Sequence, residues 1–184
     1  MAVKTSTKKS TTKAALNGKT PALDGTPINI GLTHEQRTGV AELLNVHLAN
    51  AHVLYIKTRN YHWNVQSRRF AELHEFFEEQ YDQIAAEIDE LAERVRQLGV
   101  FAPGTMAEFL QLATLKEEPG VVPAPQTMIA NLLADHESII RALREDVEKT
   151  DDLDDEGTAD FLTGLMEAHE KMAWMLRAHL VNED

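Results

Sequence analysis

The sequence predicts an all-α protein built as a bundle of four long helices. Two observations carry this prediction. Four long segments repeat their apolar residues at steps of three and four, the spacing of one helix face, and no segment alternates apolar and polar residues as a strand does. The chain has 184 residues, 43% of them hydrophobic, which suits one domain with a core.

The first helix is predicted to begin after Thr33, because Thr33-x-x-Gln36 has the sequence of a capping box. Behind this cap an apolar stripe about thirty residues long continues to the histidine at position 62. The stripe consists of Val40, Leu43, Leu44, His47, Ala51, Leu54, Tyr55, Thr58, Tyr61 and His62.

The second helix is predicted to run from Phe70 to Leu98, after an interruption at residues 64–69. Gly99 follows as the residue that ends it, since glycine readily adopts the left-handed conformation found after helix C-termini. Its stripe consists of Phe70, Leu73, Phe77, Tyr81, Ile84, Ile88, Leu91, Val95 and Leu98.

A long connection, residues 99–125, contains four prolines and a second capping box, Thr105-x-x-Glu108. This box predicts a short extra helix that carries Met106, Phe109 and Leu110. Long connections join helices that are not simple hairpin neighbours. The connection therefore favours a ferritin-like bundle with one crossover between its second and third helices.

Two further stripes, separated by the acidic stretch 151–156, predict the last two helices of the bundle. The earlier stripe consists of Ile129, Leu132, Leu133, His136, Ile140, Leu143 and Val147. The later one consists of Phe161, Leu162, Leu165, His169, Met172, Ala173, Leu176 and Leu180. We interpret the three histidines at positions 47, 136 and 169 as hydrogen-bonded core residues.

Charge divides the chain into a basic arm and an acidic body. Residues 1–30 carry five lysines and one acid, for a charge of +4, whereas the whole chain carries −12, so residues 31–184 carry −16. The arm is rich in Ser, Thr, Gly and Pro and poor in apolar residues, so we expect residues 1–30 to be disordered and residues 31–184 to form the bundle.

Composition also limits which metal sites the chain can form and where in the cell we expect the protein. The chain has no Cys, which excludes disulfides, thiolate nucleophiles, Cys-type zinc sites and iron–sulfur clusters, so any metal must be bound by His and carboxylates. No run of about 18 apolar residues is present, and the N-terminus lacks an apolar secretory segment. We therefore expect a cytoplasmic protein without a membrane partner.

Candidate metal ligands follow one face of the second predicted helix. His74 and Glu78 form an i,i+4 pair, Asp89 and Glu93 form another, and the eleven residues between Glu78 and Asp89 make three turns plus about 20°. The two pairs are nevertheless about 16 Å apart along the helix, while one metal ion has its ligands at about 2 Å. One copy of this helix therefore cannot complete a site.

An antiparallel copy from a second subunit solves this problem. A two-fold axis near residues 83–84 would bring Asp89 and Glu93 of one chain to His74 and Glu78 of the other, which gives two sites per dimer. His62 lies close by through the short turn and is a further ligand. The alternative to a metal site is that these acids form a solvent-exposed face of the helix and that the histidines lie near them by chance. Ligand type suits iron, manganese or zinc and does not choose among them.

The same residues resemble the Dps family of mini-ferritins. The resemblance is carried by Tyr61-His62-Trp63-Asn64-Val65, Leu73-His74-Glu75, Asp89-Glu90, Ala92-Glu93-Arg94 and Leu98-Gly99, and it extends over residues 33–181. The family spacing of the five ligands is met at His62, His74, Glu78, Asp89 and Glu93. Two departures are visible: the third ligand is usually Asp and is Glu78 here, and the turn after Val65, which often contains Gly-Pro in relatives, has Gln-Ser-Arg-Arg at residues 66–69.

The resemblance implies a ferroxidase and an iron store. Members of this family form hollow dodecamers that oxidise Fe(II) with hydrogen peroxide at di-iron centres between subunits, store Fe(III) inside the shell and protect DNA. By the same resemblance, Asp151, Glu156 and Asp160 fall where acids line the pores that admit iron. Acids near a helix N-terminus are also favoured by the helix dipole, which is the alternative reading.

Two further roles are expected near these features. Trp63 and Tyr61 adjoin the site in sequence and are candidate electron donors, or else amphipathic aromatics that close a dimer interface. The arm lysines, which are candidates for sequence-blind contacts to DNA phosphates, are Lys4, Lys8, Lys9, Lys13 and Lys19.

Two rival functions belong to other classes. A conventional ferritin, with its site inside one bundle, is excluded because no Glu of this chain has a His three residues later. A non-enzymatic nucleoid-packing protein with a structural metal site remains the alternative, although all five ligands are present.

Overall fold

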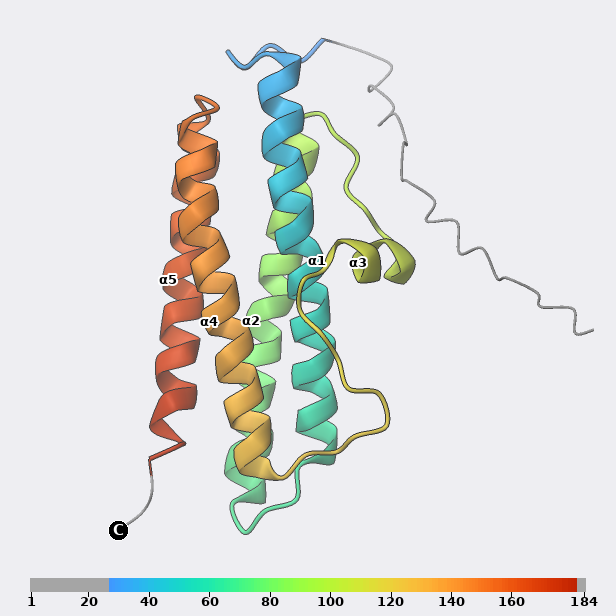
Figure 1. Ribbon diagram of the computed structural model, residues 1–184, viewed down its shortest axis with the longest axis vertical. Coiled ribbons are helices and arrows are strands. Elements are labelled where there is room, and N and C mark those ends of the chain that lie inside the picture. Colours follow the sequence, from blue (N-terminus) through green and yellow to red (C-terminus); the bar gives the residue numbers. More distant parts are fainter. Residues whose placement is uncertain (1–26, 182–184) are drawn as a thin grey trace, which may run out of the picture.

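The structure is a computed structural model that describes residues 27–181. Four long helices and one short helix account for most of these residues (Figure 1), which confirms the all-α, ferritin-like fold class. They are α1 (His34–Asn64), α2 (Phe70–Gln97), α3 (Met106–Leu112), α4 (Pro125–Asp151) and α5 (Glu156–Ala178). The five lysines of the predicted arm lie outside the described residues.

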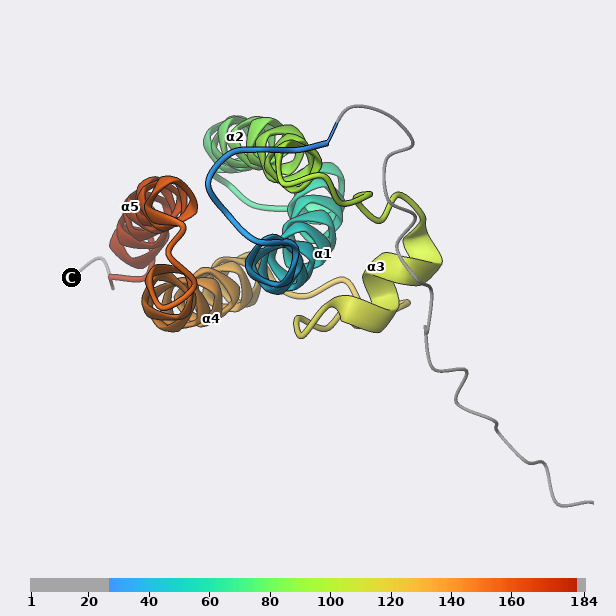
Figure 2. The same cartoon turned by 90° about the horizontal axis from the view of Figure 1, so that it is seen from above.

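The four long helices occupy the corners of a bundle when seen along its axis (Figure 2). Short turns join α1 to α2 and α4 to α5, so each of these pairs is antiparallel, and each pair packs closely together. The connection between Gln97 and Pro125 runs back along the bundle, which makes α2 and α4 parallel (Figure 1). On this path lies α3, the short helix that the second capping box predicts, and it packs against the outer side of α1 (Figure 2).

Side-chain caps fix three of the helix starts. In both predicted capping boxes the Thr hydroxyl accepts from a backbone N–H three residues on, and the Gln36 or Glu108 side chain accepts from the backbone N–H of its Thr. The Asp155 carboxylate accepts from the backbone N–H of Thr158 and caps α5. These contacts satisfy backbone groups that would otherwise lack partners.

Gly99 ends α2 in the way that its position predicts. Its φ is +79°, in the left-handed region, and the backbone N–H groups of Gly99 and Val100 donate to the carbonyls of Arg96 and Val95. A Cβ at this position would lie 1.9 Å from Ile28 Cδ1 and 2.9 Å from Arg37 Nη1. The positive φ therefore favours glycine, and a Cβ would in addition force the ends of the Ile28 and Arg37 side chains to move.

The core lies between the four long helices and contains most of the predicted stripe residues. Its largest fully buried side chains are Phe77, Leu44, Leu48, Leu54, Ile84, Leu98, Met128, Ile129, Leu132, Leu143, Leu162 and Met172. Some stripe residues lie outside the core. Phe70, the first residue of α2, is 47% exposed, and on α3 only Phe109 is buried, where it stacks on His52 with ring centroids 3.7 Å apart.

The three predicted core histidines are buried and each has a polar contact. His47 Nε2 lies 2.8 Å from Asp146 Oδ2, and the Nδ1 atoms of His136 and His169 are 2.8 Å apart. His169 Nε2 lies 3.3 Å from a carboxylate oxygen of Glu87, a buried residue of α2. Burial, and then the charge of His169, hold the pKa of His136 well below its usual range, so His136 is neutral near pH 7.

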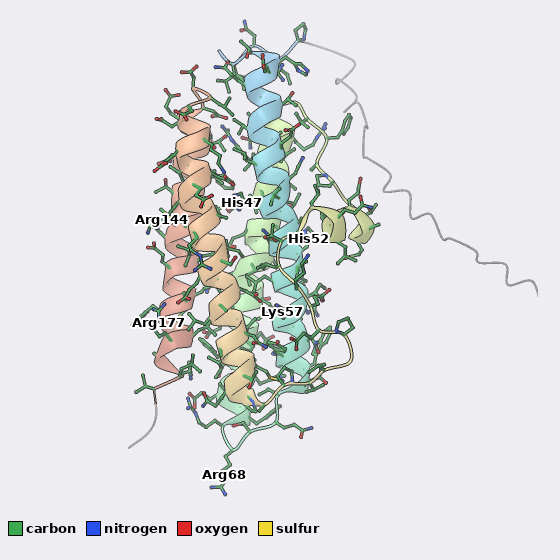
Figure 3. All side chains as sticks on the ribbon, viewed as in Figure 1. His47, His52, Lys57, Arg68, Arg144 and Arg177 are labelled. Carbon is green, nitrogen blue, oxygen red and sulfur yellow. The ribbon has the colours of Figure 1, made fainter. Side chains whose placement is uncertain are left out.

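Ion pairs connect neighbouring helices, both at the surface and in partly buried positions. Arg144 pairs with Glu170 and Arg177 pairs with Glu137, both across the α4–α5 contact (Figure 3). Lys57 on α1 is 2.6 Å from Asp135 on α4. Within residues 27–181, none of the helices is both long and apolar enough to cross a membrane.

Candidate metal centre

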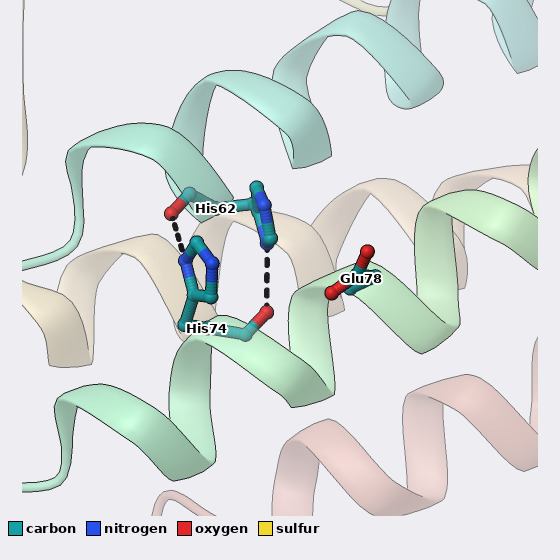
Figure 4. Close-up of side chains that lie close together, drawn as sticks. All are labelled: His62, His74 and Glu78. Carbon is teal, nitrogen blue, oxygen red and sulfur yellow. Dashed lines mark hydrogen bonds between the residues drawn. The ribbon is translucent and has the colours of Figure 1, made fainter.

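The end of α1 and the start of α2 hold two histidines face to face. The rings of His62 and His74 stack with their centroids 3.6 Å apart. His62 Nδ1 lies 2.8 Å from the backbone carbonyl of His74, and His74 Nδ1 lies 2.9 Å from the backbone carbonyl of His62 (Figure 4). The two side chains therefore clamp the helix ends to each other across the turn.

These reciprocal hydrogen bonds fix the tautomer of both rings. A carbonyl oxygen only accepts hydrogen bonds, so each Nδ1 must be the protonated nitrogen, and each Nε2 carries a lone pair when the ring is neutral. A backbone carbonyl that holds one ring nitrogen in this way is the usual support for a metal-binding histidine. Both imidazoles are thus oriented to offer Nε2 as a ligand atom.

Glu78 is the third member of a group of candidate ligands. One potential ligand atom each from His62, His74 and Glu78 lies within 4.8 Å of the other two (Figure 4), and no other group of this kind occurs among residues 27–181. His62 is buried, His74 is half-buried and Glu78 is exposed, so the group opens outward to the surface of the bundle. Two imidazoles and one carboxylate suit iron, manganese or zinc.

Asp89 and Glu93 do not join this group within one chain. Both lie further along α2, Asp89 about 16 Å and Glu93 about 22 Å from Glu78 by helix geometry, and both side chains are exposed. The chain therefore carries two separate parts of the predicted five-residue set, one with two histidines and a carboxylate, the other with two carboxylates.

The two predicted electron donors lie in different surroundings. Tyr61 is 6% exposed; its hydroxyl accepts from Asn131 Nδ2 at 3.0 Å, and its ring packs towards Phe77. Trp63 is 60% exposed, with the Arg59 guanidinium 5.0 Å from its ring centroid. Neither contact involves a ligand of the metal group.

A different tyrosine contacts the ligand group directly. The Tyr81 hydroxyl donates to Glu78 Oε1 at 3.1 Å, and the Tyr81 ring stands edge-on to the His62 ring with centroids 5.2 Å apart. Desolvation raises the pKa of Tyr81, and the hydrogen bond to Glu78 raises it further, so the phenol remains a donor. The sequence carries a signal for this contact, since Tyr81 follows Glu78 by three residues on one helix.

The predicted pore acids lie around the α4–α5 turn. Asp151 ends α4, Glu156 begins α5, and Asp160 is one turn further on; all three are exposed. The neighbouring acid Asp155 is buried instead and pairs with Arg94 of α2 at 2.9 Å. Arg94 thereby fixes this turn against the end of α2 and leaves the three exposed acids at one end of the bundle.

Similarity to known proteins agrees with this geometry. The family model of the ferritin-like domain matches residues 41–184. The chain is 54% identical, over 83% of its length and 86% of the relative, to an uncharacterized low temperature-induced protein of a Nostoc species. It is 41% identical to a DNA protection during starvation protein of Brevibacillus brevis, over 77% of this chain and 94% of that protein.

Solved structures show the same likeness. Dps from Thermosynechococcus elongatus superposes with a TM-score of 0.78 at 35% identity, over 82% of this chain and 95% of that one. A DPS protein from Vibrio cholerae O1 superposes with a TM-score of 0.79 at 33% identity, over 86% of this chain and 99% of that one. It is described as a member of a broad superfamily of ferritin-like diiron-carboxylate proteins.

The crossover bundle and the matching domain model define the class of protein, which is ferritin-like. Within that class, the Brevibacillus brevis relative at 41% identity is a DNA protection during starvation protein, and the two solved structures at 35% and 33% identity are Dps proteins, each matched over most of both chains. The chain belongs to the Dps family.

Proposed function

We propose that this protein is a Dps-type ferroxidase and iron store, which oxidises Fe(II) with hydrogen peroxide at centres shared between two subunits. One observation carries the proposal. His62, His74 and Glu78 present converging ligand atoms with both histidine tautomers fixed, and the two remaining predicted ligands face solvent three turns further along α2.

A second copy of the chain supplies what the first lacks. When two α2 helices lie antiparallel about a two-fold axis near residues 83–84, Asp89 and Glu93 of each chain meet His74 and Glu78 of the other. Each dimer then has two equivalent five-ligand centres. The exposure of Glu78, Asp89 and Glu93 supports this arrangement, because ligands shared between chains must lie on the surface of each chain.

Two Fe(II) ions side by side explain why peroxide is a safe oxidant at such a centre. Two Fe(II), one hydrogen peroxide and two protons give two Fe(III) and two waters, so both electrons reach the same peroxide. One Fe(II) acting alone gives Fe(III), hydroxide and a hydroxyl radical. The carboxylates stabilise the rising positive charge of the iron, while the fixed imidazoles set the geometry.

Other parts of the proposal concern the assembly. The Fe(III) product is stored within a hollow dodecamer in the cytoplasm, and exposed Asp151, Glu156 and Asp160 attract Fe(II) to pores through the shell. The basic residues 1–30 bind DNA without sequence preference, and twelve arms on one shell add avidity. Trp63 and Tyr61 are proposed as electron donors for radicals that escape.

Peroxide oxidation after anaerobic Fe(II) loading tests the activity. We expect ferric absorbance to appear rapidly for the wild type and to fall by at least about tenfold for an Asp89→Ala/Glu93→Ala variant of unchanged assembly. Adding Zn²⁺ or Mn²⁺ before Fe(II) should slow the wild-type reaction, because the ligand set also suits these ions. Fe(II) binding without accelerated oxidation would instead support the alternative, a nucleoid-packing protein with a structural metal site.

A further inference from the structure

Glu78 is the least constrained ligand of the His62, His74 and Glu78 group. Its side chain is exposed, whereas each histidine is held by a backbone carbonyl. Glutamate has one more rotatable bond than aspartate, so an exposed Glu loses more conformational freedom when it binds an ion. A centre that uses Glu78 gains affinity from any contact that holds this carboxylate in place beforehand.

Tyr81 makes such a contact. Its hydroxyl donates a hydrogen bond to Glu78 Oε1, and this bond does not involve the other carboxylate oxygen, Oε2. Its ring also packs edge-on with the His62 ring, with the two centroids 5.2 Å apart. One side chain thus touches two of the three ligands, from a position one turn further along α2.

Tyr81 is itself held by two residues of α1. The Arg59 guanidinium lies 5.3 Å from its ring centroid, and the Tyr55 ring meets it edge-on at 6.0 Å. Arg59 Nη1 also donates to the Tyr55 hydroxyl at 2.8 Å, which fixes Arg59 between the two rings. These contacts explain how a half-buried tyrosine on the surface of the bundle keeps one orientation.

We propose that Tyr81 is a positioning residue of the metal centre, which holds the Glu78 carboxylate and the His62 ring in the geometry that binds the ion. The proposal rests on the proposed function, because it assumes that this group binds metal. It deepens that function by assigning to a residue outside the five ligands the task of restraining the longer Glu78 side chain.

Anaerobic titration of the assembled, full-length protein with Co²⁺ tests the proposal, with the visible absorbance of the bound ion as readout. For Tyr81→Phe, which removes only the hydroxyl, we expect Co²⁺ affinity to fall about 10- to 100-fold and the absorbance bands to shift. The midpoint of thermal unfolding should remain within a few degrees of the wild type. The matched control is Thr38→Val, which removes a hydroxyl that bonds to the His34 carbonyl at the opposite end of α1, and it should bind Co²⁺ like the wild type.

A double-mutant cycle shows whether Tyr81 acts through Glu78. In a Glu78→Asp background the shorter carboxylate no longer reaches the hydroxyl, so adding Tyr81→Phe should have little further effect. Unchanged affinity and absorbance in Tyr81→Phe, or an equal loss in both backgrounds, would overturn the proposal. A His74→Ala variant separates the two hypotheses, since Co²⁺ binding that survives this change contradicts the metal centre itself, whatever Tyr81 does.

Discussion

Single residues in the centre of the bundle show how polar groups are accommodated in its core. Glu87, His136 and His169 come from three different helices and form one line of contacts. The Nε2 atom of His136 is buried and lacks a hydrogen-bond partner among residues 27–181. A proton added to His136 would therefore enter a buried site beside a second imidazole, which is energetically unfavourable.

This arrangement makes stability depend on pH. Because the pKa of His136 is lower in the folded state than its usual 6.5, the unfolded chain binds more protons as the pH falls below about 6.5. We expect the contribution of His136 to the free energy of unfolding to be fully present above pH 6.5. Below that pH the free energy of unfolding should fall by up to about 1.4 kcal/mol per pH unit.

Chemical unfolding at a series of pH values between 7.5 and 5 tests this expectation at residue 136. The His136→Leu variant should be less stable overall, since it leaves His169 Nδ1 without its partner, but it should lose less stability on acidification than the wild type. His34→Leu, at an exposed position, is the control and should retain the wild-type slope. A slope that does not change in His136→Leu would show that another group controls acid unfolding.

For the site residues, the sequence predicts which side chains are neighbours but not how they contact one another. Helical spacing indicated His62, His74 and Glu78 as neighbours, because the three positions are related by local geometry and one short turn. Neither the stacking of the two histidines nor their bonds to each other's carbonyls follows from spacing, since both depend on the conformation of residues 65–69. Tyr81 appeared in the sequence only as one apolar position among others in the second stripe.

At the scale of the elements, the period of apolar residues was sufficient to place the long helices, because each packs through one face. The period did not identify polar members of that face. Gln80 and Glu87 continue the seam of Phe77, Ile84 and Leu91 on α2 and are buried with it. Whether a polar side chain is buried depends on which side chains of the opposite helices lie against it, and no local sequence pattern shows these contacts.

The end of α2 provides a test at this scale. Gly99→Ala should destabilise the protein by about 1–3 kcal/mol, because alanine strains a positive φ and its Cβ would meet Ile28 and Arg37. Gly104→Ala is the matched control. No atom of the described part of the chain lies within 4 Å of a Cβ at Gly104, so the change should alter stability by less than about 0.5 kcal/mol. Equal effects on the urea midpoint would contradict this explanation.

At the scale of the whole molecule, the separation of ligands along α2 leads to a complementation experiment. One variant lacks the histidines, His62→Ala/His74→Ala, and the other lacks the distant acids, Asp89→Ala/Glu93→Ala. Each is expected to be inactive alone. In a mixed dimer one of the two centres combines intact histidines from one chain with intact acids from the other.

Coexpression of equal amounts of the two variants should therefore restore about one quarter of the wild-type centres, because about half of randomly formed dimers are mixed and each has one intact centre. Peroxide-dependent ferric absorbance per subunit measures the recovery. If all five ligands acted within one chain, mixing would restore nothing.

The charge difference between the arm and the body leads to a second test of the whole molecule. Deleting residues 1–30 should abolish retention of DNA in a gel-shift experiment, because the remaining chain is strongly acidic. For the full chain, log affinity should fall with log salt by about 0.9 for each phosphate contact. Unchanged retention by the truncated protein would exclude the arm as the DNA-binding element.

The distance between the two ligand pairs of α2 has a consequence for the order of events in a cell. Under the proposed function, a newly synthesised subunit would carry every ligand without bringing them together, so it would stay inert towards iron until it had paired. Oxidation would then begin only where the shell that stores the insoluble product is being assembled, and free monomers would not deposit ferric mineral in the cytoplasm.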